Sequence, residues 1–172
     1  MVETKELVHE YLKDLNPQSV LDLGCGEGKK SLRFLKKGAK VTGIDKKEMT
    51  FNEENFNFIR EDIQNFKITD KYDLIISSLV LHFIKKERAI SIISNIKEKT
   101  NKGGYNFLIC MSDKDDCAKL KKENFYPNME NLEKLYLDWE IVKKDNLTTN
   151  LENHGEGEHF HNLLFLLARK TK

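Results

Sequence analysis

The stretch Val20-Leu21-Asp22-Leu23-Gly24-Cys25-Gly26-Glu27-Gly28 decides the fold. A short apolar run, which predicts a buried strand over residues 19–23, ends on three glycines at alternate positions. Glycines in such a loop let the backbone pass close to a ligand, because no Cβ stands in the way. Residues 29–37 then carry apolar side chains at helical spacing and stop at Gly38. The stretch therefore predicts a strand, a ligand-binding loop and a helix in succession.

The same alternation of strands and helices continues on both sides of this stretch. Upstream, apolar spacing predicts a helix over residues 7–15, which ends where Asn16 precedes Pro17. Downstream, apolar runs predict strands over residues 41–44, 56–59, 72–81, 105–111, 139–142 and 163–168, and helices over 88–99 and 130–137. A turn is expected at Gly103-Gly104, and residues 113–123 are interpreted as a surface loop or short helix. The second and third strands lie so close in sequence that the helix between them is reduced.

This order of elements predicts an α/β fold with a doubly wound, mostly parallel sheet of seven strands. The last two strands follow each other without a helix, so an antiparallel last strand should close the sheet as a hairpin. With 172 residues, 39% hydrophobic and 33% charged, the chain is expected to form one domain over residues 1–172.

Composition excludes several classes of function. The 29 Lys and Arg nearly balance the 28 Asp and Glu, so a net charge of +1 gives no global field for nucleic acid or an anionic membrane. No apolar run approaches the length of a membrane span, and the first residues lack the apolar stretch of a signal peptide. Three cysteines suit reduced thiols in the cytoplasm. We expect a soluble cytoplasmic monomer or homodimer whose partner is a small molecule.

Acidic residues close the first three predicted strands and indicate a nucleoside site. Asp45 ends the second strand, where a carboxylate accepts hydrogen bonds from ribose hydroxyls in nucleotide-binding sheets. Asp62 and Ile63 follow the third strand and offer a carboxylate, a backbone N–H and an apolar side chain to an adenine ring. A dinucleotide is a poorer match, since the third glycine of its G-x-G-x-x-G fingerprint falls on Lys29.

These motifs resemble the class I S-adenosylmethionine-dependent methyltransferases. The resemblance is carried by residues 20–28, Gly43-Ile44-Asp45, Glu61-Asp62-Ile63 and Tyr72-Asp73-Leu74-Ile75. Residues 72–81, 100–106, 111–112, 138–140 and 167–170 are more narrowly similar to the tellurite-resistance (TehB-like) branch, whose members methylate tellurium and selenium oxyanions. The resemblance implies a Rossmann-like methyltransferase fold with S-adenosyl-L-methionine as the cofactor. The cofactor-binding residues that we assign are Asp22, Gly24, Cys25, Gly26, Asp45, Lys46, Asp62, Ile63, Ser78 and Leu79.

By resemblance, Asp22, Gly24 and Gly26 flank the methionine end of the cofactor, Asp45 the ribose, and Asp62 with Ile63 the adenine. Ser78 and Leu79 belong near the methyl group, because ligands of open α/β sheets lie beyond the carboxyl ends of the strands.

Histidines are the candidate catalytic residues. His82 follows the fourth strand and is either a base or donor beside the acceptor, or a packing residue at the strand end. His159 and His161 share one face of an extended segment and, with His154, stand in the turn between the last two strands. Three interpretations of that turn stay open: it holds an oxyanion or removes a proton, it ligates a divalent ion with Glu156 or Glu158, or it is a solvated turn. No residue is assigned as a metal ligand.

The sequence thus predicts a methyltransferase acting on a small molecule such as a tellurite- or selenite-type oxyanion. A thiol or hydroxyl metabolite as acceptor, and a non-catalytic cofactor-binding or regulatory subunit, are the alternatives. A nicotinamide-dependent oxidoreductase is a further enzymatic rival. A nucleic-acid methyltransferase is disfavoured, because Ser77-Ser78-Leu79-Val80 stands where such enzymes carry a motif that holds a flipped base.

Overall fold

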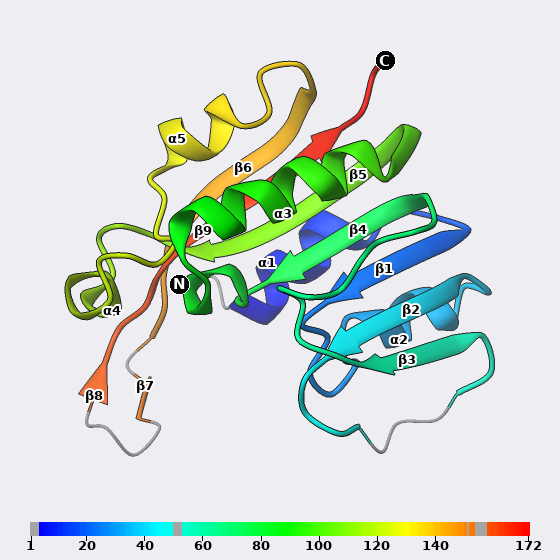
Figure 1. Cartoon of the computed structure of the whole chain (residues 1–172), viewed down its shortest axis with the longest axis horizontal. Helices are drawn as coiled ribbons and strands as arrows, with labels where there is room; N and C mark the ends of the chain where they lie inside the picture. The colour runs from blue at the N-terminus through cyan, green and yellow to red at the C-terminus, as the bar shows by residue number, and fades with distance from the viewer. Residues whose placement is uncertain (1–3, 50–52, 151, 154–157) are drawn as a thin grey trace.

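A seven-stranded sheet forms the centre of the computed structural model, which describes residues 4–49, 53–150, 152–153 and 158–172. Its strand order is β3-β2-β1-β4-β5-β9-β6 (Figure 1). The strands are β1 (Ser19–Leu23), β2 (Lys40–Asp45), β3 (Phe56–Arg60), β4 (Tyr72–Ser78), β5 (Thr100–Met111), β6 (Glu140–Thr148) and β9 (Asn162–Arg169). Neighbouring strands are parallel except where β9 pairs antiparallel with β5 and with β6. The predicted mixed sheet with an antiparallel last strand is confirmed.

Helices cover both faces of the sheet (Figure 1). They are α1 (Thr4–Leu12), α2 (Ser31–Leu35), the 3₁₀ turn η1 (Leu81–Phe83), α3 (Lys86–Glu98), α4 (Asp116–Leu120) and α5 (Met129–Lys134). Residues of α3 and α5 join one apolar core, and residues of α1 and α2 join the other. None of the described helices has the length and apolar composition that a bilayer crossing requires. The sheet therefore separates two apolar layers.

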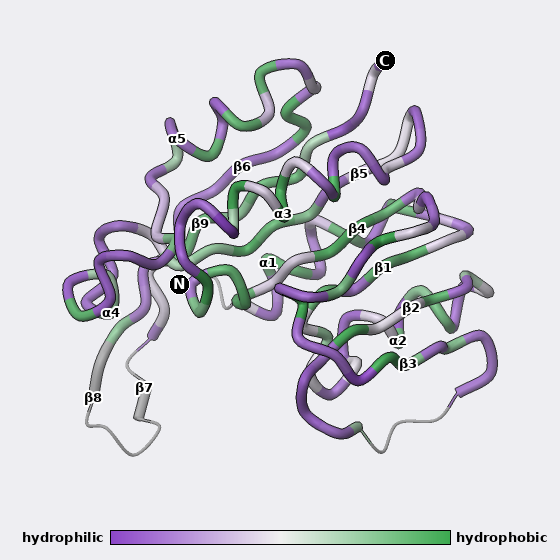
Figure 2. Tube along the Cα trace, in the orientation of Figure 1, coloured by the Kyte–Doolittle hydropathy of each residue, from purple (hydrophilic) through white to green (hydrophobic). Residues whose placement is uncertain are grey.

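Burial follows position in the sheet. The inner strands β1, β4, β5 and β9 carry runs of buried side chains, and Figure 2 shows the apolar colour concentrated along them. The edge strand β6 alternates exposed and half-buried residues, because one of its faces meets water. The prediction that this strand ends at residue 142 was wrong for this reason, since Lys143, Lys144 and Asp145 continue the alternation up to Thr148.

The helices predicted to end at residues 15, 37 and 137 end earlier, at Leu12, Leu35 and Lys134. A strand end and a turn also differ from the predictions. The fourth strand ends at Ser78 instead of residue 81, because Leu79 has a positive φ of 54° and the chain then enters η1. The expected turn at Gly103-Gly104 lies inside β5, where pairing with β4 jumps from Thr100 to Tyr105. A Cβ on Gly104 would stand 2.7 Å from the carbonyl oxygen of Asp73, so only glycine fits this interruption.

The connections at the carboxyl end of the sheet hold little regular structure. Between β2 and β3, residues 46–49 and 53–55 contain no helix, and residues 50–52 lie outside the description. Between β6 and β9, the short strands β7 (Glu152–Asn153) and β8 (Glu158–His159) pair antiparallel, which the sequence did not predict. Because β6 is parallel to β5 and β9 returns beside both, this connection lies at the same edge as the ends of β1 and β4.

Candidate functional site

The loop after β1 takes a conformation that requires its glycines. Gly24, Gly26 and Gly28 have φ values of 69°, 53° and 70°, in the left-handed region that other residues avoid. The amides of Gly24 and Cys25 both donate to the carbonyl of Ile44, at 2.8 and 3.0 Å, which folds the loop against β2. A Cβ on Gly24 would stand 2.7 Å from Val80 Cγ2, whereas one on Gly26 would meet nothing within 4 Å. Gly26 therefore faces open space.

Asp45 joins this loop to the end of β2. Its Oδ2 accepts a hydrogen bond from the amide of Gly26, and its Oδ1 accepts one from the amide of Lys47, each at 2.9 Å. A carboxylate accepts about four hydrogen bonds, so both oxygens retain capacity for a ligand. Asp45 thus shapes the glycine loop and offers acceptors beside it.

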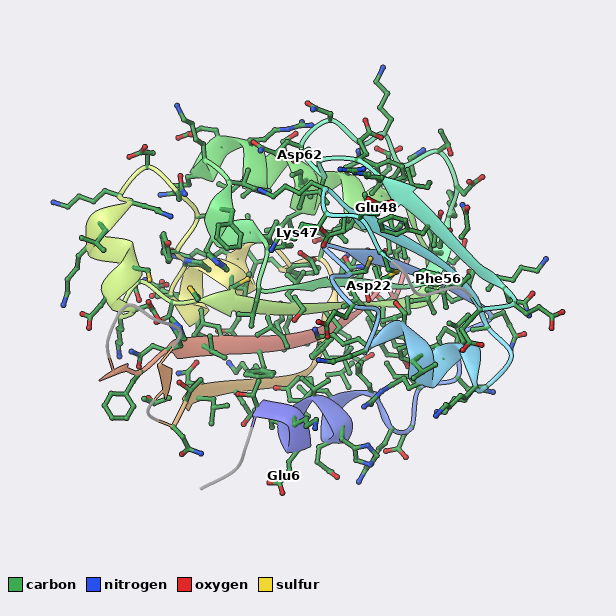
Figure 3. The ribbon with its side chains drawn as sticks, turned by 90° about the horizontal axis from the view of Figure 1, so that it is seen from below. Glu6, Asp22, Lys47, Glu48, Phe56 and Asp62 are labelled. Atoms are coloured by element: carbon green, nitrogen blue, oxygen red, sulfur yellow. The ribbon has the colours of Figure 1, made fainter. Side chains whose placement is uncertain are left out.

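A cavity of about 400 Å³ opens at these strand ends. Its lining residues are Gly24, Gly26, Asp45, Lys46, Lys47, Asp62, Ile63, Gln64, Leu79, Val80, Phe83 and Ile84. In the sheet order, β1 has β2 on one side and β4 on the other, so the cavity lies at the point where the strand order reverses. In Figure 3, Lys47 and Asp62 of the cavity lie far from Glu6, which α1 carries on the opposite side.

The turn after β3 presents Asp62 and Ile63 to the cavity. The Oδ1 of Asp62 accepts the amide of Gln64 at 2.9 Å, which fixes the carboxylate against its own turn. Ile63 is 7% exposed and belongs to the apolar core beneath the cavity. This turn places a carboxylate next to an apolar wall, as the sequence predicts.

The backbone is strained at Leu79, the residue that directly follows β4. Its φ of 54° is unusual for a residue with a bulky side chain, and its amide is held by the carbonyl of Ile109 at 2.8 Å. Strain of this kind persists where the surroundings impose it, and it clusters at functional sites. At Leu79 the strain turns the chain so that Val80 and Phe83 line the cavity.

Three residues assigned to the cofactor lie behind the lining. Asp22 is 1% exposed and accepts a hydrogen bond from Ser31 Oγ at 2.8 Å. Burial raises its pKa, although Lys30 and Ser31 oppose the shift. Cys25 and Ser78 are also buried. These residues support the loop and the strand end from beneath, while the other seven assigned residues line the cavity.

Sequence reasoning missed five lining residues. Lys47, Gln64, Val80, Phe83 and Ile84 line the cavity and were not assigned. Phe83 could have been predicted, because it lies a few residues after the buried fourth strand and aromatic side chains often line ligand sites; it is 60% exposed. The other four residues line the cavity because of the conformations of the turns that carry them, and the sequence pattern does not predict those conformations.

His82 is buried beside the cavity. It is 6% exposed, and its Nδ1 has no hydrogen-bond partner among the described residues. Burial lowers the pKa of the imidazole to about 4; Asp115 opposes this shift, and His161 and Lys121 add to it. His82 is therefore neutral at physiological pH. Its ring packs 4.0 Å from that of Phe83, and its carbonyl accepts the side-chain amide of Asn124 at 2.9 Å.

The histidines of the β6–β9 connection are only partly described. His154 lies outside the described residues, and of His159 only the backbone, in β8, is described. His161 is half-buried directly before β9, and its Nδ1 lies 3.1 Å from Asp115 Oδ2. Asp115 was missed, because residues 113–123 were interpreted as a charged surface segment. The structure buries Asp115 to 1% exposure and gives it three N–H partners.

Comparison with known proteins shows which family this chain is similar to. The model of the family described as "Tellurite resistance protein TehB" matches residues 1–163. A curated relative from Haemophilus influenzae, named "Probable S-adenosyl-L-methionine-dependent methyltransferase TehB", is 35% identical over 95% of this chain. The chain spans 61% of the length of that relative.

Solved structures show the same fold. The crystal structure of TehB from Haemophilus influenzae superposes with a TM-score of 0.77 and 30% identity, covering 95% of this chain and 61% of that one. The N-methyltransferase NodS from Bradyrhizobium japonicum, solved with S-adenosyl-L-homocysteine, gives a TM-score of 0.72 at 15% identity, covering 98% and 85%. Because the family model matches nearly the whole chain and the relative is similar over nearly all of it, this chain belongs to the TehB family.

Proposed function

We propose that this chain is an S-adenosylmethionine-dependent methyltransferase that acts on a small molecule. The observation that carries the proposal is the cavity at the switch point of the sheet, which brings together Gly24, Gly26, Asp45, Asp62 and Ile63. The names of the Haemophilus relative and the S-adenosylhomocysteine found in NodS agree with this cofactor. The site must then hold an adenosyl group and a sulfonium.

The residues present suit that ligand. Open space above Gly26 admits the ligand close to backbone amides, and Asp45 has acceptor capacity for two ribose hydroxyls. Ile63 supplies an apolar wall for the adenine, and the exposed ring of Phe83 lies across the same cavity. The bound cofactor would supply a methyl group on a positively charged sulfur, which is displaced in line by a lone pair of the acceptor.

The chain's own contribution is to orient the acceptor and to exclude water. The acceptor belongs over the end of β5 and the adjoining end of β4, since the cofactor cavity extends from the end of β3 across β2 and β1 to the residues that follow β4. We propose His82, His159 and His161 as the catalytic residues on this side. A neutral imidazole such as that of His82 accepts a proton from a thiol, selenol or hydroxyl acceptor, or donates a hydrogen bond to an oxyanion.

We further propose a tellurite- or selenite-type oxyanion as the acceptor, on the ground of the family's description. We place the enzyme in the cytoplasm as a monomer or homodimer of one domain, with neither nucleic acid nor membrane as a partner. The supporting observations are a net charge of +1 and three cysteines in a short chain.

The test is transfer of a labelled methyl group from S-adenosylmethionine to a panel of tellurite, selenite, small thiols and hydroxylated metabolites. We expect labelled product with at least one acceptor. Binding of the cofactor without transfer to any acceptor would contradict catalysis and favour a regulatory subunit.

The same assay examines the histidines. Replacing His159 and His161 together with alanine should lower turnover while the affinity for S-adenosylhomocysteine stays within about twofold, because His161 is not among the described residues that line the cofactor cavity. Unchanged turnover would mean that the β6–β9 connection has no part in catalysis.

A further inference from the structure

A second cluster of reactive side chains lies outside the cofactor cavity. Asp115 follows β5, Cys117 stands in the first turn of α4, and His161 directly precedes β9. One potential ligand atom from each of these three residues lies within 4.8 Å of the other two. β5 ends and the antiparallel β9 begins at the same edge of the sheet, so the cluster lies at the carboxyl edge, beyond the end of β5. We call these residues the Asp115 cluster.

Hydrogen bonds organise the Asp115 cluster in advance. Asp115 Oδ2 accepts the amide of Asn162 at 2.9 Å, and Oδ1 accepts the amide of Cys117 at 3.0 Å as the N-cap of α4. Oδ2 also lies 3.1 Å from His161 Nδ1. Three partners thus fix the position of the carboxylate.

The carboxylate also fixes the tautomer of His161. An ionised carboxylate only accepts hydrogen bonds, so without an ion Nδ1 carries the hydrogen. An ion that takes Asp115 Oδ2 and His161 Nδ1 as ligands displaces that proton, which is released to water. The backbone of His161 is held as well, since its amide donates to Thr149 Oγ1 at 2.9 Å and its carbonyl accepts the amide of Thr149 at 2.8 Å.

The three side chains of the Asp115 cluster favour some metal ions over others. Atoms that coordinate zinc at about 2.0 to 2.3 Å stand roughly 3 to 4 Å from one another, so a set within 4.8 Å needs to contract by only about an ångström. A thiolate and an imidazole favour zinc and its neighbours among the transition metals, whereas magnesium and calcium take oxygen ligands. Three protein ligands leave one position of a tetrahedral ion for a fourth group.

We propose that Asp115, Cys117 and His161 form a binding site for a divalent transition-metal ion of the zinc class. The bound ion joins α4 to the start of β9 and keeps one position for a fourth group. The three residues do not line the cofactor cavity, so binding of the ion and binding of S-adenosylhomocysteine can be measured separately.

Cobalt(II) is the probe, because its coordination by a thiolate produces an intense charge-transfer band that zinc lacks. Titrating the full chain with cobalt chloride, in the presence of a non-thiol reductant, should produce this band and saturate at one cobalt per chain. Adding zinc should abolish the band by displacement, since the same ligands bind zinc more tightly.

Variants assign the band to the cluster. Cys117→Ser should remove the charge-transfer band, and His161→Gln should weaken cobalt binding by at least about tenfold. Cys110→Ala is the matched control, because Cys110 is buried on β5 outside the cluster and its loss should leave the band intact. Circular dichroism establishes that each variant is folded.

Three results would overturn the inference: no thiolate band in the folded parent chain, a band that survives Cys117→Ser, or a band lost in folded Cys110→Ala. A cobalt spectrum without any binding of S-adenosylhomocysteine would refute the proposed function and leave the metal site standing. Binding of S-adenosylhomocysteine without a cobalt spectrum would refute the metal site and leave the proposed function standing.

Discussion

Gly26 shows at the scale of one residue how the backbone creates the ligand site. Its φ of 53° lies in the left-handed region, and a Cβ built on it would enter open space beside the cavity. Gly38 has a φ of 84° and equally open surroundings, but it lies in the turn before β2, away from the cavity. Both glycines need a positive φ, but only Gly26 lines the cavity.

Comparing Gly26→Ala with Gly38→Ala separates these two effects. Both variants should lose about 1 to 2 kcal/mol of stability in urea unfolding, since each forces alanine into the left-handed region. Only Gly26→Ala should also weaken S-adenosylhomocysteine binding, by about tenfold or more, because its methyl group occupies ligand space. Equal affinity of the two variants for this ligand would mean that the glycine loop does not contact it.

At the scale of elements, Asp73 ties the amino ends of three strands together. Its Oδ2 accepts the amides of Gln18 and Ser19 and the Ser19 hydroxyl, at 3.0 to 3.1 Å, and its Oδ1 accepts the Asn101 side chain at 2.8 Å. Partial burial raises the pKa of Asp73. The four hydrogen bonds lower the pKa by more than burial raises it, so it lies below its usual value of 3.8. The carboxylate therefore stabilises the junction of β1, β4 and β5.

Asp73→Ala should lower the free energy of unfolding by about 1 to 3 kcal/mol at neutral pH. Because the folded pKa of Asp73 is lowered, its contribution is complete above pH 3.8 and is lost as the pH falls through the folded value. Urea unfolding at a series of pH values should show the difference between parent and variant shrinking below pH 3.8. Asp70→Ala is the control, since exposed Asp70 contacts only Thr69 Oγ1 among described hydrogen bonds, and a loss as large in this variant would contradict the account.

The elements also show what a sequence reveals and what it leaves hidden. Strands buried on both faces, such as β1 and β9, were predicted almost to the residue, because continuous apolar runs mark them. The edge strand β6 was cut short, since its charged residues alternate with half-buried ones. Asp45 and Asp62 were found because their places at strand ends are set by topology. Asp115 was missed, because only the return of β9 brings His161 to it.

At the scale of the whole molecule, the central position of β9 makes the fold depend on its last strand. β9 pairs with both β5 and β6, and its residues from Leu163 to Ala168 are all buried. Burial of its large apolar side chains contributes about 10 kcal/mol, which equals the entire stability of a typical domain. The sheet is therefore complete only when the end of the chain has been inserted between β5 and β6.

A chain shortened to residues 1–161 should consequently remain unfolded, as judged by circular dichroism and by the absence of a cooperative urea transition. A chain lacking only Thr171 and Lys172 is the control, because Lys170 retains its backbone contacts with Gly103 and Gly104. A cooperative transition in the 1–161 chain would contradict the central role of β9.

The proposed function requires that the cavity at the switch point bind an adenosyl sulfonium. Isothermal titration of the purified chain with S-adenosylhomocysteine, with NAD⁺ as the competing ligand, is the most direct test. We expect saturable binding of one S-adenosylhomocysteine per chain, unaffected by NAD⁺. Absence of that binding, or binding of NAD⁺ in its place, would refute the proposed cofactor site.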